Sequence, residues 1–131
     1  MGRMVKRCLA VSLALAMFVG GTAQAVTTYN TRLTLRASST SIQKGDRVVF
    51  SGHLKSKFEK CYNHRKVTLY RNGKAVDSKQ TSSTGSFRFV WHPRRTHTWK
   101  VKFAGKTGGT HPNQWVCNAS ASDPVKVLVT G

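Results

Sequence analysis

Short runs in which apolar and polar residues alternate are the feature of this sequence that most constrains its fold. Trp99, Val101 and Phe103, for example, are separated by Lys100 and Lys102. A period of two places successive side chains on opposite faces of a β-strand, and no stretch after residue 25 repeats with the period of a helix. The alternation therefore predicts an all-β domain. We expect seven strands, near residues 32–37, 46–54, 66–71, 75–81, 86–92, 98–104 and 124–130.

The turns and the polar strand positions support the same architecture. Asn72 and Gly73 separate two of the runs, and this pair readily adopts the positive φ angles of a tight hairpin turn. The basic residues of the strands alternate with apolar ones, so we expect them to face solvent. They are Lys66, Arg71, Arg88, Lys100, Lys102 and Lys126.

The N-terminus has the composition of an export signal. A basic segment and an apolar stretch over residues 8–20 precede Ala23 and Ala25, the small residues that signal peptidase reads. The stretch is about 13 residues long, shorter than the ~20 that a helix needs to cross a bilayer. We therefore predict a cleaved signal peptide over residues 1–25 and a secreted, extracellular domain over residues 26–131 with no transmembrane segment. An uncleaved membrane anchor is the alternative.

Cysteine usage agrees with export. Cys8 falls in the predicted signal peptide, and only Cys61 and Cys117 remain after cleavage. An even pair in an oxidising compartment predicts a disulfide bond. Closing a loop of about 56 residues contributes about 4 kcal/mol to stability in the chain-entropy estimate.

Four stretches share motifs with a known family. A Gly-Asp turn opens residues 45–52, a V-x-L-Y-R strand covers residues 67–71, a T-G-x-F-x-F turn and strand cover residues 84–89, and an aromatic-x-V-x-F-x-G strand covers residues 98–105. In these residues the chain resembles the secreted bacterial immunoglobulin-like repeat. The resemblance implies a seven-stranded, antiparallel immunoglobulin-like β-sandwich. Because the shared positions are turn glycines and core residues, the resemblance implies a fold and no activity.

Only four carboxylates are present for acid–base or nucleophilic chemistry, and a structural role explains each of them more simply than a catalytic one. Asp46 belongs to the Gly-Asp turn, and Asp77 and Asp123 lie in or beside predicted turns. Glu59 lies in a lysine-rich loop. We therefore expect a binding module that is not an enzyme, with no catalytic residue and no cofactor.

The histidines do not predict a metal site. A metal site needs a tight cluster of ligands, and Arg94 and Arg95 would repel a cation from the neighbouring His92 and His97. Paired cysteines leave no thiolate ligand, so we expect no metal. The five histidines are His53, His64, His92, His97 and His111.

Charge is the strongest functional signal. Residues 26–131 keep 19 of the 22 lysines and arginines and all four acids, a net charge of +15. Solubility favours a net charge of roughly 2–8 for a small domain. The excess attracts anionic polymers within a Debye length, about 8 Å at physiological salt. We expect an anionic polymer or an acidic protein at the cell surface as the partner, with nucleic acid bound only non-specifically.

The candidate ligand-binding residues cluster around the two cysteines, in long connections over residues 55–65 and 105–119 that the disulfide would join. They are Tyr62, His64, Arg65, Lys106, His111 and Trp115. Exposed aromatic rings stack on sugars or bases when basic side chains lie beside them. In the alternative interpretation Trp115 packs over the disulfide and has a structural role.

Two other functions use the same charge. A membrane-active effector would engage anionic lipid, although no segment after residue 25 shows the contiguous apolar face that such proteins have. An accessory structural domain would have no ligand of its own, and its charge would be spread evenly over the surface. The distribution of basic residues on the folded domain distinguishes these alternatives from a binding module.

Overall fold

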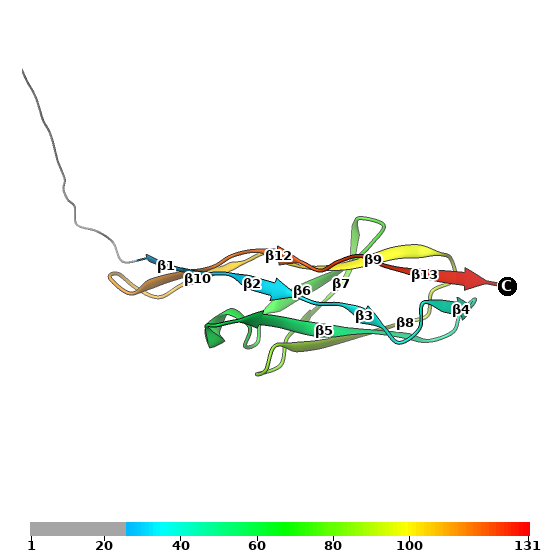
Figure 1. Cartoon of the computed structure of the whole chain (residues 1–131), viewed down its shortest axis with the longest axis horizontal. Coiled ribbons are helices and arrows are strands. Elements are labelled where there is room, and N and C mark those ends of the chain that lie inside the picture. The colour runs from blue at the N-terminus through cyan, green and yellow to red at the C-terminus, as the bar shows by residue number, and fades with distance from the viewer. Residues whose placement is uncertain (1–25) are drawn as a thin grey trace, which may run out of the picture.

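The computed structural model describes residues 26–131, so the predicted signal peptide and its cleavage site lie outside the described residues. The described chain is elongated and almost entirely β (Figure 1). Its one helical element is the short 3-10 turn η2 (Glu59–Cys61). The strands are β1 (Val26–Tyr29), β2 (Thr31–Leu33), β3 (Arg36–Ala37), β4 (Ser41–Gln43), β5 (Val48–Ser56), β6 (Lys66–Arg71), β7 (Lys74–Gln80), β8 (Ser86–Trp91), β9 (His97–Phe103), β10 (Lys106–Gly108), β11 (Gln114–Cys117), β12 (Ser120–Ala121) and β13 (Val125–Thr130).

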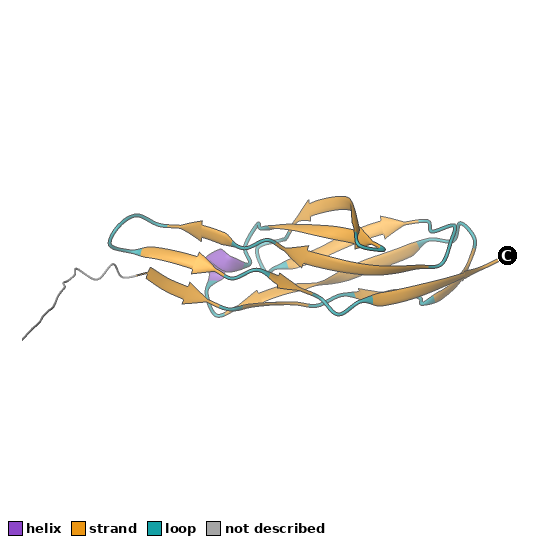
Figure 2. Cartoon of the chain, turned by 90° about the horizontal axis from the view of Figure 1, so that it is seen from above, coloured by secondary structure: helices purple, strands orange, loops and turns teal. Residues whose placement is uncertain are grey.

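Two sheets form the sandwich. One is six-stranded, in the order β4-β13-β9-β6-β7 with β12 also on β9, and the other is four-stranded, in the order β2-β5-β3 with β8 also on β5. They lie along the long axis of the molecule as two layers (Figures 1 and 2). The all-β domain predicted from alternation and the β-sandwich implied by the family resemblance are both confirmed.

The apolar positions of the alternating runs meet between these layers. The four-stranded sheet contributes Val48, Phe50, Leu54 and Phe89, and the six-stranded sheet contributes Val67, Leu69, Trp99, Val101 and Val127. All of these side chains are fully buried. The rings of Phe50 and Trp99 pack with centroids 4.5 Å apart across the interface. Burying each such side chain is favourable by roughly 1.5–3 kcal/mol. Because alternation places these side chains on one face of each sheet, it determines which faces pack together.

The structure adds short strands that the sequence does not predict: β1, β4, β10, β11 and β12. Residues 105–119, expected to be an irregular connection, form the hairpin β10–β11, and β1 pairs with β11 to make a three-stranded sheet. The β1–β11 and β4–β13 pairs are parallel, unlike the expected antiparallel arrangement. These strands have two to four residues, too few for an alternating pattern, and β1 and β4 pair with strands far away in the chain.

The predicted strand over residues 32–37 is interrupted between β2 and β3. Its backbone crosses β5 so closely at Gly52 that a Cβ there would lie 1.9 Å from the Thr34 carbonyl oxygen. The His53 amide donates to the Thr34 hydroxyl (3.0 Å) instead of to a backbone carbonyl. Gly52 therefore permits a close approach that breaks the strand in two.

The hairpin between β6 and β7 has the predicted turn, with φ of 50° at Asn72 and 81° at Gly73. The outward position predicted for Arg71 is wrong. Arg71 has the same strand parity as the buried Leu69, and its guanidinium lies over the Trp91 ring, 5.8 Å from the centroid. It therefore covers the open end of the sandwich.

The predicted disulfide joins Cys61, in the turn after β5, to Cys117 at the end of β11. Their Cα atoms are 5.5 Å apart, and both residues are buried. The bond therefore fastens the three-stranded sheet to the main sandwich.

Candidate functional site

Two arginines flank a serine on the outer face of the four-stranded sheet. Arg36 of β3 lies opposite Ser51 of β5, and Ser51 lies opposite Arg88 of β8. Both arginines are exposed, and Ser51 is half-buried. A small hydroxyl between two guanidinium groups leaves room for an anion, which could accept hydrogen bonds from both sides.

Further basic residues continue along β5 in the same direction. The outward positions after Ser51 are His53, which pairs with Ser86, and Lys55, which pairs with Arg32. Alternate residues of a strand are roughly 6.7 Å apart, so these rows form a regular series. The exposed Lys57 follows directly after the strand. We call this set the cationic track; it consists of Arg32, Arg36, His53, Lys55, Lys57 and Arg88.

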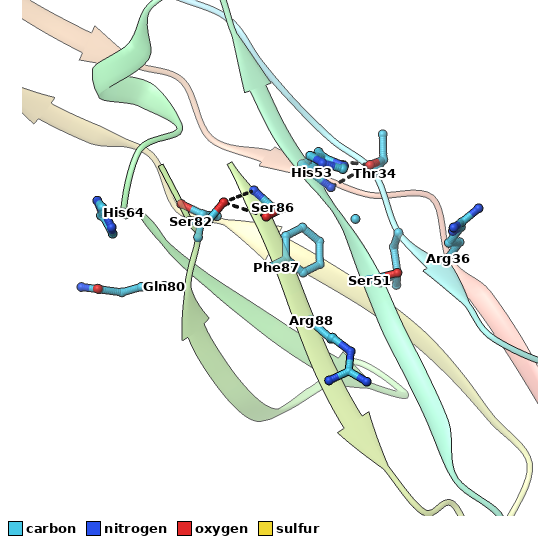
Figure 3. A pocket seen from close by; sticks show the side chains of 13 residues that line it. Thr34, Arg36, Ser51, His53, His64, Gln80, Ser82, Ser86, Phe87 and Arg88 are labelled. Atoms are coloured by element: carbon cyan, nitrogen blue, oxygen red, sulfur yellow. Dashed lines mark hydrogen bonds between the residues drawn. The ribbon is translucent and has the colours of Figure 1, made fainter. Parts of the chain in front are cut away.

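Two grooves run along the cationic track. The first has a volume of 970 Å³ and contains Arg36, His53 and Arg88 (Figure 3). The second has a volume of 660 Å³ and contains the track residues Arg32, Lys55 and Lys57. No aspartate or glutamate lines either groove. Within the described residues, these grooves therefore present cationic and neutral groups only.

The acidic side chains lie outside these grooves. Asp46, Glu59 and Asp77 accept hydrogen bonds from nearby amide groups, those of Gln43, Asn63 and Ser78 respectively. Asp123 lines a separate groove of 410 Å³, which also includes Arg32. Three of the acids therefore bind nearby amide groups, and no carboxylate lines either track groove.

Basic residues also cover the outer face of the six-stranded sheet. Lys66, Lys102 and Lys126 are exposed there, and Lys100 is half-buried. The Lys102 ammonium lies 4.7 Å from the centroid of the half-buried Tyr70 ring. The positive charge is thus distributed over both faces, which is the distribution expected for the accessory-domain alternative. The two larger grooves and the exposed arginines Arg32, Arg36 and Arg88 distinguish the four-stranded face.

Three of the residues predicted from the loops come together in a groove of 380 Å³: His64, Arg65 and Lys106. The Arg65 guanidinium lies 5.9 Å from the centroid of the Trp115 ring, and Arg65 Nε donates to the Lys60 carbonyl (2.6 Å). The disulfide-joined loops therefore do form a basic surface with an aromatic ring beneath it.

The other loop residues are placed differently. The half-buried Tyr62 ring packs against the core, and His111 is exposed in the connection between β10 and β11. Trp115 lies opposite Gly108, and a Cβ on Gly108 would lie 2.3 Å from the indole. Trp115 thus covers a glycine, and it also packs edge-on against Phe58 with ring centroids 5.4 Å apart.

None of the six residues of the cationic track was among the site residues predicted from the sequence. Alternation along β5 places Ser51, His53 and Lys55 on the outer face, a signal available from the sequence. The positions of Arg36 and Arg88 beside Ser51 depend on strand register, which alternation does not specify.

The fold defines an immunoglobulin-like β domain, and comparisons with known proteins agree. A solution structure of the CARDB domain of a Pyrococcus furiosus protein matches with a TM-score of 0.54 and 11% identity, covering 79% of this chain and 97% of that one. The crystal structure of that domain in complex with di-metal ions matches with a TM-score of 0.43 and 14% identity, covering 78% and 90%. At this identity the likeness shows the fold alone. No protein-family model and no curated protein matches the chain.

Residues 26–131 contain no group of three or more His, Cys, Asp or Glu side chains placed to hold a metal ion. Nor do they include a helix with the length and apolar character needed to span a membrane.

Proposed function

We propose that this domain is an exported binding module that attaches to an anionic polymer at or near the cell surface through the cationic track. The observation that carries the proposal is the strand register that sets Arg36 and Arg88 on either side of Ser51. Arginine presents a planar fork of donors that matches phosphate, sulfate and carboxylate groups. The proposed activity is attachment, without catalysis.

The energetics of the sheet support this proposal. Arg32 and Lys55 lie directly opposite each other on neighbouring strands, and like charges in this position destabilise a sheet. An anion bound in the adjacent 660 Å³ groove would offset that repulsion. The free surface therefore carries an electrostatic repulsion that a bound anion would relieve.

The spacing of the rows suits a linear polyanion. Successive outward positions of β5 are roughly 6.7 Å apart, so a polymer lying along the strand could place successive anionic groups near successive rows. Binding would release counterions from the polymer, and affinity would fall steeply with salt.

The test measures affinity for heparin-like, teichoic-acid-like and nucleic-acid ligands as a function of salt concentration. We expect micromolar or weaker binding at low salt that is largely lost at high salt. The double variant Arg36→Gln/Arg88→Gln should reduce the slope of log affinity against log salt by about two. Lys102→Gln/Lys126→Gln, which removes the same charge from the opposite face, should change the slope less.

Two results would contradict the proposal. One is failure of the unmodified domain to bind any of these polyanions at low salt. The other is an equal loss of affinity in the two double variants, which would show that total charge matters and its position does not.

A further inference from the structure

Three aromatic rings form a continuous cluster at the Lys57 end of the cationic track. Tyr29 of β1 stacks on Phe58 with ring centroids 4.4 Å apart, and Phe58 meets Trp115 of β11 edge-on at 5.4 Å. All three residues are half-buried, so part of each remains accessible. Rings held together in this way lose little conformational freedom when a ligand binds.

These rings line a pocket of 230 Å³ together with Thr27, Asn113 and Gln114. We call it the aromatic pocket. Thr27, Asn113 and Gln114 contribute one hydroxyl and two carboxamides, which can both donate and accept hydrogen bonds. No charged side chain lines it. Its volume lies below the roughly 300–1,000 Å³ of pockets for drug-sized ligands, so it is suited to a single ring.

The aromatic pocket adjoins the cationic track at Tyr29. Tyr29 lines both the aromatic pocket and the 660 Å³ groove, which also contains Lys57. Hydrogen bonds fix this junction: the Phe58 amide donates to the Ser56 hydroxyl (3.3 Å), and that hydroxyl donates to the Asn30 carbonyl (3.0 Å). A polymer lying on the track would therefore pass beside Tyr29, which forms one wall of the pocket.

We infer that the polymer is an anionic glycan, with one sugar ring in the aromatic pocket and its acidic groups on the cationic track. This inference rests on the proposed function and names the chemical class of its ligand. Aromatic rings provide apolar contact for the C–H face of a sugar, and Asn113, Gln114 and Thr27 provide partners for its hydroxyl groups. Inorganic polyphosphate would match the track alone, because it has no ring for the pocket.

The test compares two polyanions: sulfated heparin fragments, which contain sugar rings, and inorganic polyphosphate, which does not. Tyr29→Ala should weaken binding of the heparin fragments by about tenfold, the effect typical of a lost stacking contact. The same variant should bind polyphosphate as the unmodified domain does. Gln114→Ala, which leaves the aromatic cluster in place, should weaken heparin binding by a smaller factor.

Tyr70→Ala is the matched control, since Tyr70 is a half-buried tyrosine beside a lysine on the opposite face. It should leave both affinities unchanged.

The inference would be overturned if Tyr29→Ala and Gln114→Ala changed neither affinity or reduced both equally. It would also be overturned if a single-stranded oligonucleotide bound more tightly than heparin and lost that advantage in Tyr29→Ala, since the pocket would then hold a base. Absence of binding to both polyanions would refute the proposed function itself.

Discussion

The two outer faces of the sandwich carry the same sign of charge with different chemistry. On the four-stranded sheet the charge comes largely from the guanidinium groups of Arg32, Arg36 and Arg88, set along two acid-free grooves. On the six-stranded sheet the outward cations are lysines, such as Lys102 and Lys126. Lysine is a compact, strongly hydrated point charge, whereas arginine binds oxyanions with two parallel hydrogen bonds. Under the proposed function, the lysine face would increase general attraction and the arginine face would determine where the polymer is held.

Removing the disulfide has the largest expected effect on stability, because the bond closes a long loop and fastens the three-stranded sheet to the main sandwich. Replacing both Cys61 and Cys117 with Ala should lower the free energy of unfolding by about 4 kcal/mol, since the unfolded chain loses a long closed loop. Urea unfolding measures this change. At urea concentrations below the unfolding midpoint, the folded fraction of this variant should still bind polyanions through the cationic track. Loss of binding by folded protein would assign the site to the disulfide-joined loops.

Gly52→Ala should disrupt the arginine face selectively. Its new Cβ would meet the Thr34 carbonyl, a backbone group that cannot move without shifting β2 and β3, and we expect a loss of about 3 kcal/mol. Gly73→Ala is the control on the other sheet, where no atom lies within 4 Å and only the left-handed φ of 81° opposes a side chain. That strain costs about 1–2 kcal/mol. Thermal unfolding of both variants checks the difference, and equal losses would contradict the close packing at Gly52.

Arg36→Lys/Arg88→Lys sharpens the comparison by keeping the charge and removing the guanidinium forks. We expect affinity for a sulfated glycan to fall by about fivefold, while the salt dependence stays unchanged because the number of cations is the same. Isothermal titration at several salt concentrations separates the two quantities. Unchanged affinity would show that the arginine face acts only through its charge.

The smallest expected effect concerns His97, which lies at the end of the sandwich. Burial, followed by the nearby charges of Arg71 and Arg95, lowers the pKa of His97 below its ordinary value of 6.5. The Asn72 amide lies 2.7 Å from His97 Nδ1, which accepts its hydrogen bond when the ring is neutral. The unfolded chain therefore takes up a proton near pH 6.5 before the folded protein does.

It follows that His97 contributes stability above pH 6.5, and that this contribution declines as the pH falls below that value. Replacing His97 with Gln should flatten the dependence of the melting temperature on pH between about 7 and 5. His111→Gln, at an exposed position, should leave the dependence as it is. An unchanged slope in the His97 variant would show that other groups cause it.

Alternation and turn residues predicted most of the sandwich because they act locally. The runs around Phe50, Leu69 and Val101 identify core strands, and Asn72 with Gly73 identifies a hairpin. The short strands β1, β10 and β11 could not be predicted, because three or four residues are too few to show alternation and because β1 pairs with β11 from far away in the chain. The inward position of Arg71 could have been predicted, since it follows from strand parity with Leu69.

The sequence predicted that the candidate site is basic, but it did not predict where on the domain the site lies. Net charge indicated a polyanion, and the cysteine spacing brought Arg65, Lys106 and Trp115 into one region. The pairing of Arg36 with Arg88 across Ser51 is a product of register, and the contact of Tyr29 with Phe58 is a product of the three-stranded sheet. Neither leaves a pattern in the linear sequence.

The most direct test of the cationic track is a titration of the isotopically labelled domain with a sulfated glycan fragment, followed by amide chemical shifts in NMR spectra. Track binding predicts that the largest shift changes fall on β3, β5 and β8 around Ser51, and that they extend to Tyr29 at the aromatic pocket. Amides of β6, β9 and β13 should change little. Shift changes centred on Lys100, Lys102 and Lys126 of the lysine face, or spread evenly over both sheets, would contradict the assignment of the polymer to the four-stranded sheet.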